Sequence, residues 1–213
     1  MATQAPTSPP PRSRLGRAKP LIYAASGLGL VAVAARARRR GGFLRGGAAT
    51  IETLRDMRLA ELQELYSAEQ QLGMLLPVLI SAATDPRLRI ILSECADETN
   101  QRLDLLRSHI GQLGANPRAH PDQAMRALTS EARKMTKVSM PTVRDAGLIA
   151  SMQRLLHYRI AVYGTVAAYA RALGETYHAG ALADYSNRDK LFDERLTELA
   201  EAVVNPSADI EEP

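Results

Sequence analysis

The sequence predicts an all-α protein, an antiparallel four-helix bundle, and three observations support this fold class. The 213 residues contain no Trp and two Phe among 46% hydrophobic side chains, a composition typical of helical proteins. Apolar residues recur at spacings of three and four in four long stretches, which is the period of a helix face packed on a core. Each of these apolar stripes is interrupted near its middle by a charged residue.

The first two predicted helices should form a hairpin. One runs from about Ile51 to Ala83, and Pro77 is expected to kink its last third because proline has no amide N–H for the helical hydrogen bond. The next begins after Asp85, a capping residue followed by proline at the first helical position, and ends at Gly114. Because the connection between them is short, the two helices should be antiparallel neighbours.

A second hairpin is predicted from Val143–Leu173, which ends before Gly174, and from about Tyr177–Val204. The 27 residues from 115 to 141 that join the two hairpins contain a short helical pattern at Gln123–Lys137. A connection of this length can cross the bundle, as in ferritin-like folds. We therefore expect a ferritin-like bundle with a short crossover helix.

The charged residues that interrupt the four stripes are Glu69, Glu98, Arg159 and Asp189, with Arg102 a less clean interruption of the second stripe. In an antiparallel bundle these positions can lie at one level of the core. An arginine cannot lose its charge by deprotonation, so Arg159 must either meet carboxylates or reach water. We expect Arg159 to form a core ion pair with one or more of the three acids. In the alternative, the arginine extends its long stem to solvent and the acids lie at the stripe edges, where ion pairs contribute little.

Charge is divided unevenly along the chain, although the net charge is only +4. The first 49 residues carry nine Arg and Lys residues and no acid, which leaves 18 of the 27 bases against all 23 acids, a net charge of −5, for the rest. The predicted bundle is thus mildly acidic, and this balance gives no support to nucleic-acid binding by the bundle. The strongly basic segment is an N-terminal arm.

The arm divides into three parts, followed by the bundle at residues 50–205 and an acidic tail at 206–213. Residues 1–19, rich in Pro, Ser and Arg, are expected to be a disordered basic tail. Residues 20–35 are an uncharged apolar run, which spans about 24 Å as a helix against the ~30 Å hydrocarbon core of a bilayer. We expect a single transmembrane or anchoring helix there, with a cytoplasmic bundle. Residues 36–49 form a basic, Gly-rich linker with four arginines that can contact lipid or nucleic acid: Arg36, Arg38, Arg39 and Arg40.

Three alternatives stay open for the apolar run at residues 20–35. Its last residues can end a signal peptide, although the arginine cluster just beyond is a poor start for a translocated domain. An Arg-rich N-terminus without acids also resembles an organelle transit peptide. In the third alternative the arm is a disordered tail that touches anionic lipid or nucleic acid nonspecifically, and the protein is cytoplasmic.

Segments in all four predicted helices resemble the YciE/YciF ferritin-like family: Thr50–Leu54, Glu64–Leu72, Asp97–Thr99, Arg144–Ile149, His157–Thr165 and Lys190–Ala200. The resemblance covers about residues 50–205. It implies a ferritin-like bundle, an association with bacterial stress responses, and a homodimer. Bundles of this kind resemble those that hold two iron or manganese ions between carboxylates, which implies ferroxidase-type activity.

The resemblance also marks the acids that would hold such metals. Glu69 matches the acid of the first helix, and Asp97 and Glu98 match the acids of the second. Asp189 is one acid retained from the acidic run usual in the fourth helix, and Asp193 is a further candidate. These residues are the predicted residual metal site.

Departures from the family pattern affect this site. Arg159 follows His157 and Tyr158 where family members commonly have a glutamate, which reverses the charge at a ligand position. Three residues beyond Glu98 and Asp189 the sequence has no histidine, so neither helix has a Glu-x-x-His pair. Four further positions lack the histidine or acid that the family can have: Asn100, Leu156, Asn187 and Arg188.

Two main hypotheses follow from the resemblance and its departures. In the first, the protein is stress-associated, its dimetal site is degenerate, it needs no cofactor, and it acts as a non-catalytic structural or interaction module. In the alternative, it binds iron or manganese at a residual site and has ferroxidase-type activity. A weaker third hypothesis assigns DNA binding to the basic arm. The single cysteine, Cys95, is expected to be a small core residue.

Overall fold

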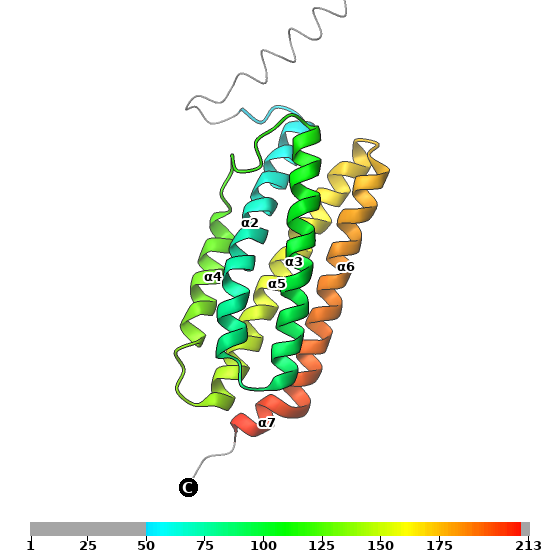
Figure 1. The fold of residues 1–213 in the computed structure, drawn as a ribbon. Coiled ribbons are helices and arrows are strands. Elements are labelled where there is room, and N and C mark those ends of the chain that lie inside the picture. Colours follow the sequence, from blue (N-terminus) through cyan, green and yellow to red (C-terminus); the bar gives the residue numbers. More distant parts are fainter. Residues whose placement is uncertain (1–49, 210–213) are drawn as a thin grey trace, which may run out of the picture. The chain divides into compact units, whose positions relative to one another are not determined.

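The computed structural model describes residues 50–209, and within that range every regular element is helical. The all-α prediction is confirmed. Helix labels follow Figure 1, and the elements are α2 (Leu54–Ala82), α3 (Pro86–Gln112), α4 (Gln123–Met135), α5 (Pro141–Ala172), α6 (Thr176–Leu199), the π-helical turn η1 (Ala200–Val204) and α7 (Asn205–Ala208).

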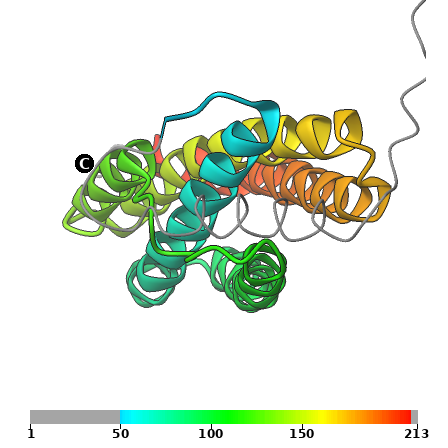
Figure 2. The same cartoon turned by 90° about the horizontal axis from the view of Figure 1, so that it is seen from above.

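Four long helices form an antiparallel bundle, and a fifth joins its halves (Figure 1). Helices α2 and α3 make one hairpin, and α5 and α6 make the other. Figure 2 shows the bundle from above, with α5 and α6 running side by side. Helix α4 packs on α2 and α5 and is the crossover between the hairpins, as the long connection predicts.

Capping residues explain where the first three of these helices begin. Helix α2 starts after Thr53, later than expected, because the Thr53 hydroxyl accepts a hydrogen bond from the Asp56 amide at 3.2 Å and the Asp56 carboxylate accepts one from the Thr53 amide at 3.0 Å. Asp85 caps α3 as expected, and Asp122 caps α4. The α-helical path of α2 continues through Pro77.

The C-terminal end of the bundle differs from the expected stop at Asn205-Pro206. Helix α6 ends at Leu199, and the chain continues through η1 into the short helix α7. Pro206 is tolerated there because it lies in the first turn of α7, where an amide N–H has no helical partner. Part of the predicted acidic tail is therefore helical, whereas residues 210–213 lie outside the described residues.

A buried carboxylate ties the two hairpins together near this end. Asp145, in the first turns of α5, accepts hydrogen bonds from the Thr84 amide at 2.9 Å, from the Thr84 hydroxyl, and from the Asp85 amide at 2.7 Å. Only 3% of its surface is exposed. The Asp145 side chain thus helps to fix the turn between α2 and α3 to α5.

The apolar core is divided into two clusters along the bundle. One is formed mainly by the C-terminal half of α2, the N-terminal halves of α3 and α5, and the C-terminal half of α6. The other is formed by the opposite halves of the same four helices. Between them lies a level of buried charged residues, which is the candidate functional site.

The N-terminal predictions fall on residues that the structure does not describe. The expected tail at residues 1–19, the anchoring helix at 20–35 and the arginines of the linker at 36–49 all lie outside the described residues. Between residues 50 and 209, no helix is long and apolar enough to cross a bilayer.

Candidate functional site

Four charged side chains, one from each helix of the bundle, meet in the core at a single level. Glu69 of α2, Arg102 of α3, Arg159 of α5 and Asp189 of α6 are each 0% exposed. We call these four residues the buried charge cluster. Three of its members, Glu69, Arg159 and Asp189, are the charges that interrupt their stripes, and Arg102 takes the core position expected for Glu98.

Each guanidinium of the buried charge cluster faces both carboxylates. Arg159 places one terminal nitrogen 2.7 Å from Asp189 Oδ1 and its Nε 3.3 Å from Glu69 Oε1. Arg102 places one terminal nitrogen 2.8 Å from Asp189 Oδ1 and the other 3.9 Å from Glu69 Oε1. Two fixed positive charges therefore stand between two buried acids.

Two tyrosine rings complete the surroundings of Arg102. The Tyr163 hydroxyl donates a hydrogen bond to Glu69 Oε1 at 2.7 Å. The Arg102 guanidinium lies over the rings of Tyr163 and Tyr185, 5.3 Å and 4.8 Å from their centroids. Such contacts with the negative faces of aromatic rings stabilise a desolvated cation.

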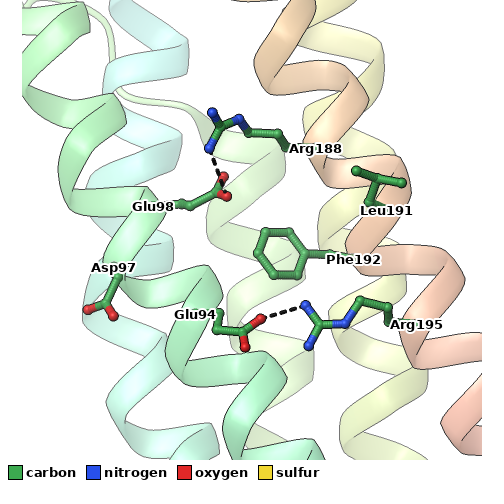
Figure 3. Close-up of a pocket in the computed structure, with 7 residues that line it drawn as sticks. All are labelled: Glu94, Asp97, Glu98, Arg188, Leu191, Phe192 and Arg195. Atoms are coloured by element: carbon green, nitrogen blue, oxygen red, sulfur yellow. Dashed lines mark hydrogen bonds and ion pairs between the residues drawn. The ribbon is translucent and has the colours of Figure 1, made fainter.

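Glu98, one of the acids expected to pair with Arg159, pairs with other arginines, and Asp97 lies outside the buried charge cluster. The Glu98 side chain is 19% exposed and pairs with Arg102 at 3.0 Å and with Arg188 at 3.2 Å. Asp97 is exposed, and in Figure 3 its carboxylate points away from that of Glu98. Both line a groove of about 370 Å³ between α3 and α6, whose other lining residues are Glu94, Arg188, Leu191, Phe192 and Arg195.

Burial and the neighbouring Arg159 guanidinium shift the pKa values of the buried acids in opposite directions. Desolvation raises the pKa of Asp189 to about 8 and also raises the pKa of Glu69, while the charge of Arg159 acts to lower both. Burial alone would lower the pKa of Arg159, but the charges of Asp189 and Glu69 outweigh it and raise that pKa. The guanidinium therefore stays charged, and without its charge the pKa of both carboxyl groups would rise further.

Hydrogen bonding in the cluster is incomplete. Among the described residues, Glu69 Oε2, Asp189 Oδ2 and the Nε atoms of both arginines are buried without a hydrogen-bond partner. Buried ion pairs recover their desolvation cost only when the remaining donors and acceptors are also satisfied. We infer that the cluster specifies the arrangement of the helices more than it adds to stability.

Cys95 lies beside the cluster, and we predict that its thiol is unreactive in the folded protein. Burial raises the pKa of Cys95 to about 12, and an Arg159 nitrogen lies 3.7 Å from its Sγ. Because the thiolate is the reactive form, alkylation at pH 8 should be on the order of 100-fold slower in the native protein than in denaturant. Mass spectrometry of iodoacetamide-treated protein measures this ratio, and equal rates would contradict the prediction.

The residues present do not fit a dimetal centre. Within residues 50–209, no group of three or more His, Cys, Asp or Glu side chains is placed to hold a metal ion. The nearest acids, Glu69 and Asp189, face two guanidiniums, and Asp193 instead pairs with His157 at 3.2 Å. These two acids are thus paired with guanidinium groups, which cannot be deprotonated.

Fold and site together define the class of protein, an all-α four-helix bundle with a charged level across its core. The sequence matches the family model "Domain of unknown function (DUF892)" over residues 53–209. The chain therefore belongs to the DUF892 family, and the predicted relationship to YciE and YciF is confirmed.

Individual relatives agree with this family. The chain is 31% identical to Protein YciF of Escherichia coli K12 over 161 residues, which cover 75% of this chain and 97% of that protein. The crystal structure of the E. coli stress protein YciF matches with a TM-score of 0.67 and 32% identity, covering 73% of this chain and 99% of YciF. YcfI of Rhodopseudomonas palustris, for which a structural role has been suggested, has a TM-score of 0.67 and 31% identity over 71% of this chain and 98% of its own.

Sequence reasoning missed the full role of Arg102. The second stripe was expected to be interrupted by Glu98 and less cleanly by Arg102, but the buried positions are Thr99, Arg102 and Leu106. The stripe is shifted by one residue because the helix face drifts along a long helix. A walk from Cys95 in steps of four, three and four reaches these buried positions and would have placed Thr99, and not Glu98, beside Arg102 on the core face.

Proposed function

We propose that this protein is a stress-associated, YciF-type module whose dimetal site is degenerate and whose role is structural or interactive and not catalytic. The observation that carries this proposal is the pair of buried guanidiniums, Arg102 and Arg159, between Glu69 and Asp189. The association with stress rests on similarity to the E. coli stress protein YciF. Contact of the basic arm with anionic lipid, and assembly as a homodimer, are further parts of the proposal.

The chemistry of guanidinium supports this proposal. A dimetal centre holds carboxylates together through cations that can exchange and, for iron, change oxidation state. An arginine side chain supplies the same sign of charge through fixed donors, cannot be deprotonated, and carries no redox chemistry. The cluster thereby keeps the electrostatic role of a metal centre and loses its reactivity.

A second candidate is residual binding of iron or manganese. It is favoured by the unpartnered oxygens Glu69 Oε2 and Asp189 Oδ2 and by the partly exposed Glu98 at the groove. If Arg159 moved aside, these three acids would be the nearest donors. Ferroxidase-type activity would follow only in that case.

Metal content after anaerobic loading with Fe(II) and with Mn(II) tests the proposal. We expect the unmodified full-length chain to retain no stoichiometric metal, because ions would have to enter beside two fixed cations. Arg159→Glu should gain metal, since it adds an acid at the level of Glu69 and Asp189. Arg154→Glu, on the exposed face of the same helix, is the matched control and should gain none. Near-stoichiometric metal in the unmodified chain would refute the degenerate-site proposal and favour the second candidate.

A further inference from the structure

A second charged cluster lies at the other end of the bundle from the turn held by Asp145. It is formed where α2 begins, α3 ends and α6 begins, at the top of Figure 1. We call it the histidine end cluster, and its members are Arg58, His109, Glu175 and His178. None of them takes part in the buried charge cluster.

Two stacked histidines form the centre of the histidine end cluster. The rings of His109 and His178 are parallel within 10°, with centroids 3.6 Å apart, so α3 and α6 touch through them. His109 is only 3% exposed, and neither of its ring nitrogens has a hydrogen-bond partner among the described residues. Such contact between flat faces suits two neutral rings and is opposed by charge on both.

The carboxylate of Glu175 forms ion pairs with the positively charged side chains around it. Glu175, just before α6, pairs with Arg58 of α2, which is 1% exposed, and lies 3.7 Å from a nitrogen of Arg55. Its Oε2 is also 3.8 Å from Nε2 of His109. The first turn of α6 has no side-chain cap, so its amide groups add partial positive charge near His178.

These surroundings keep His109 neutral in the folded protein. Burial, His178 and Arg58 lower the pKa of His109 to about 4, and Glu175 opposes them. If His109 gains a proton, a new cation is placed against the buried Arg58 and the ring of His178. A single carboxylate then faces all of these positive groups.

We propose that the histidine end cluster is an acid-sensitive latch. When His109 takes up a proton, the first turns of α6 separate from the ends of α2 and α3, while the remainder of the bundle stays folded. The fold thus carries a device that exposes one end of the bundle in acid.

The direction of the effect follows from proton linkage. The pKa of His109 is lower in the closed state than its ordinary value of 6.5, so the opened state binds the proton more readily. The closed end is therefore fully stable above pH 6.5 and loses stability as the pH falls from 6.5 towards about 4. Between pH 6.5 and 4.5 the opening equilibrium should rise roughly 40-fold through this one group.

Hydrogen exchange of residues 176–182 in the full-length protein, corrected for intrinsic rates, tests the latch. We expect protection there to fall by that factor between pH 6.5 and 4.5 in the unmodified chain and in the control His120→Gln, whose histidine lies between α3 and α4. In His109→Gln protection should be nearly independent of pH. An equal loss in His109→Gln, or a loss spread evenly over all four helices, would overturn the proposal.

A second measurement decides the matter even if His109→Gln does not fold. Ring proton resonances of the unmodified protein report the protonation of each histidine by NMR. We expect His109 to stay neutral down to about pH 5 and to titrate together with the loss of protection in α6. If His109 titrates near 6.5 while α6 remains protected, the latch does not exist.

Discussion

Replacing Arg159 with methionine should lower the free energy of unfolding by about 3 kcal/mol, because removing one partner strands buried carboxylates. Glu69 and Asp189 are both 0% exposed and would keep only Arg102 as a cationic partner within the buried charge cluster. The loss should shrink as the pH falls, since burial raises the pKa of both acids and they can then take up protons. Urea unfolding at pH 8 and at pH 6 measures the effect.

Arg154→Met is the matched control, because Arg154 lies on the same helix but is exposed. We expect it to change the free energy of unfolding by less than about 0.5 kcal/mol. An unchanged unfolding midpoint for Arg159→Met, without added metal, would show that the carboxylates do not depend on this guanidinium.

Replacing Asp145 with alanine should cost about 3 kcal/mol by a different mechanism. The substitution removes the charged acceptor of the Thr84 and Asp85 amides, and a hydrogen bond to a charged group contributes roughly 1.5–3 kcal/mol. Thermal unfolding followed by circular dichroism measures the loss. The same variant should also loosen the turn between α2 and α3.

Asp145→Asn separates the contribution of shape from that of charge. Its side chain keeps one oxygen that can accept from these amides, so we expect a loss of only about 1 kcal/mol. Equal losses for Asp145→Ala and Asp145→Asn would show that the negative charge, and not the hydrogen bonds, holds the turn.

Much of the fold could be predicted because the apolar periodicity, the helix-capping residues and the connection lengths all indicate the same helix packing. The apolar stripe of α5 places Leu148, Met152 and Leu155 in the core, on the same helix face that carries Arg159. Asp85 followed by proline marks the start of α3, and the long connection predicts the crossover α4. Periodicity alone therefore brings one charge from each helix to the middle of the core.

The contacts that could not be predicted join residues far apart in the sequence, because they depend on which helix ends meet in the folded protein. The contact of Asp145 with Thr84 joins residues 61 positions apart, and no local pattern marks it. The stacking of His109 on His178 likewise depends on the relative rotation of α3 and α6. Arg102 was within reach of the sequence, but the drift of the helix face placed it at the edge of the expected stripe.

The charged level across the core also determines how the four helices are aligned along their axes. With apolar clusters on both sides of it, sliding one helix by a single turn, about 5.4 Å, would move a charged group in among leucines and leave its partners alone. An all-apolar bundle has no such penalty, because one leucine can replace the next. The buried arginines and acids of this protein therefore favour one axial register of the four helices over registers that are shifted by one turn.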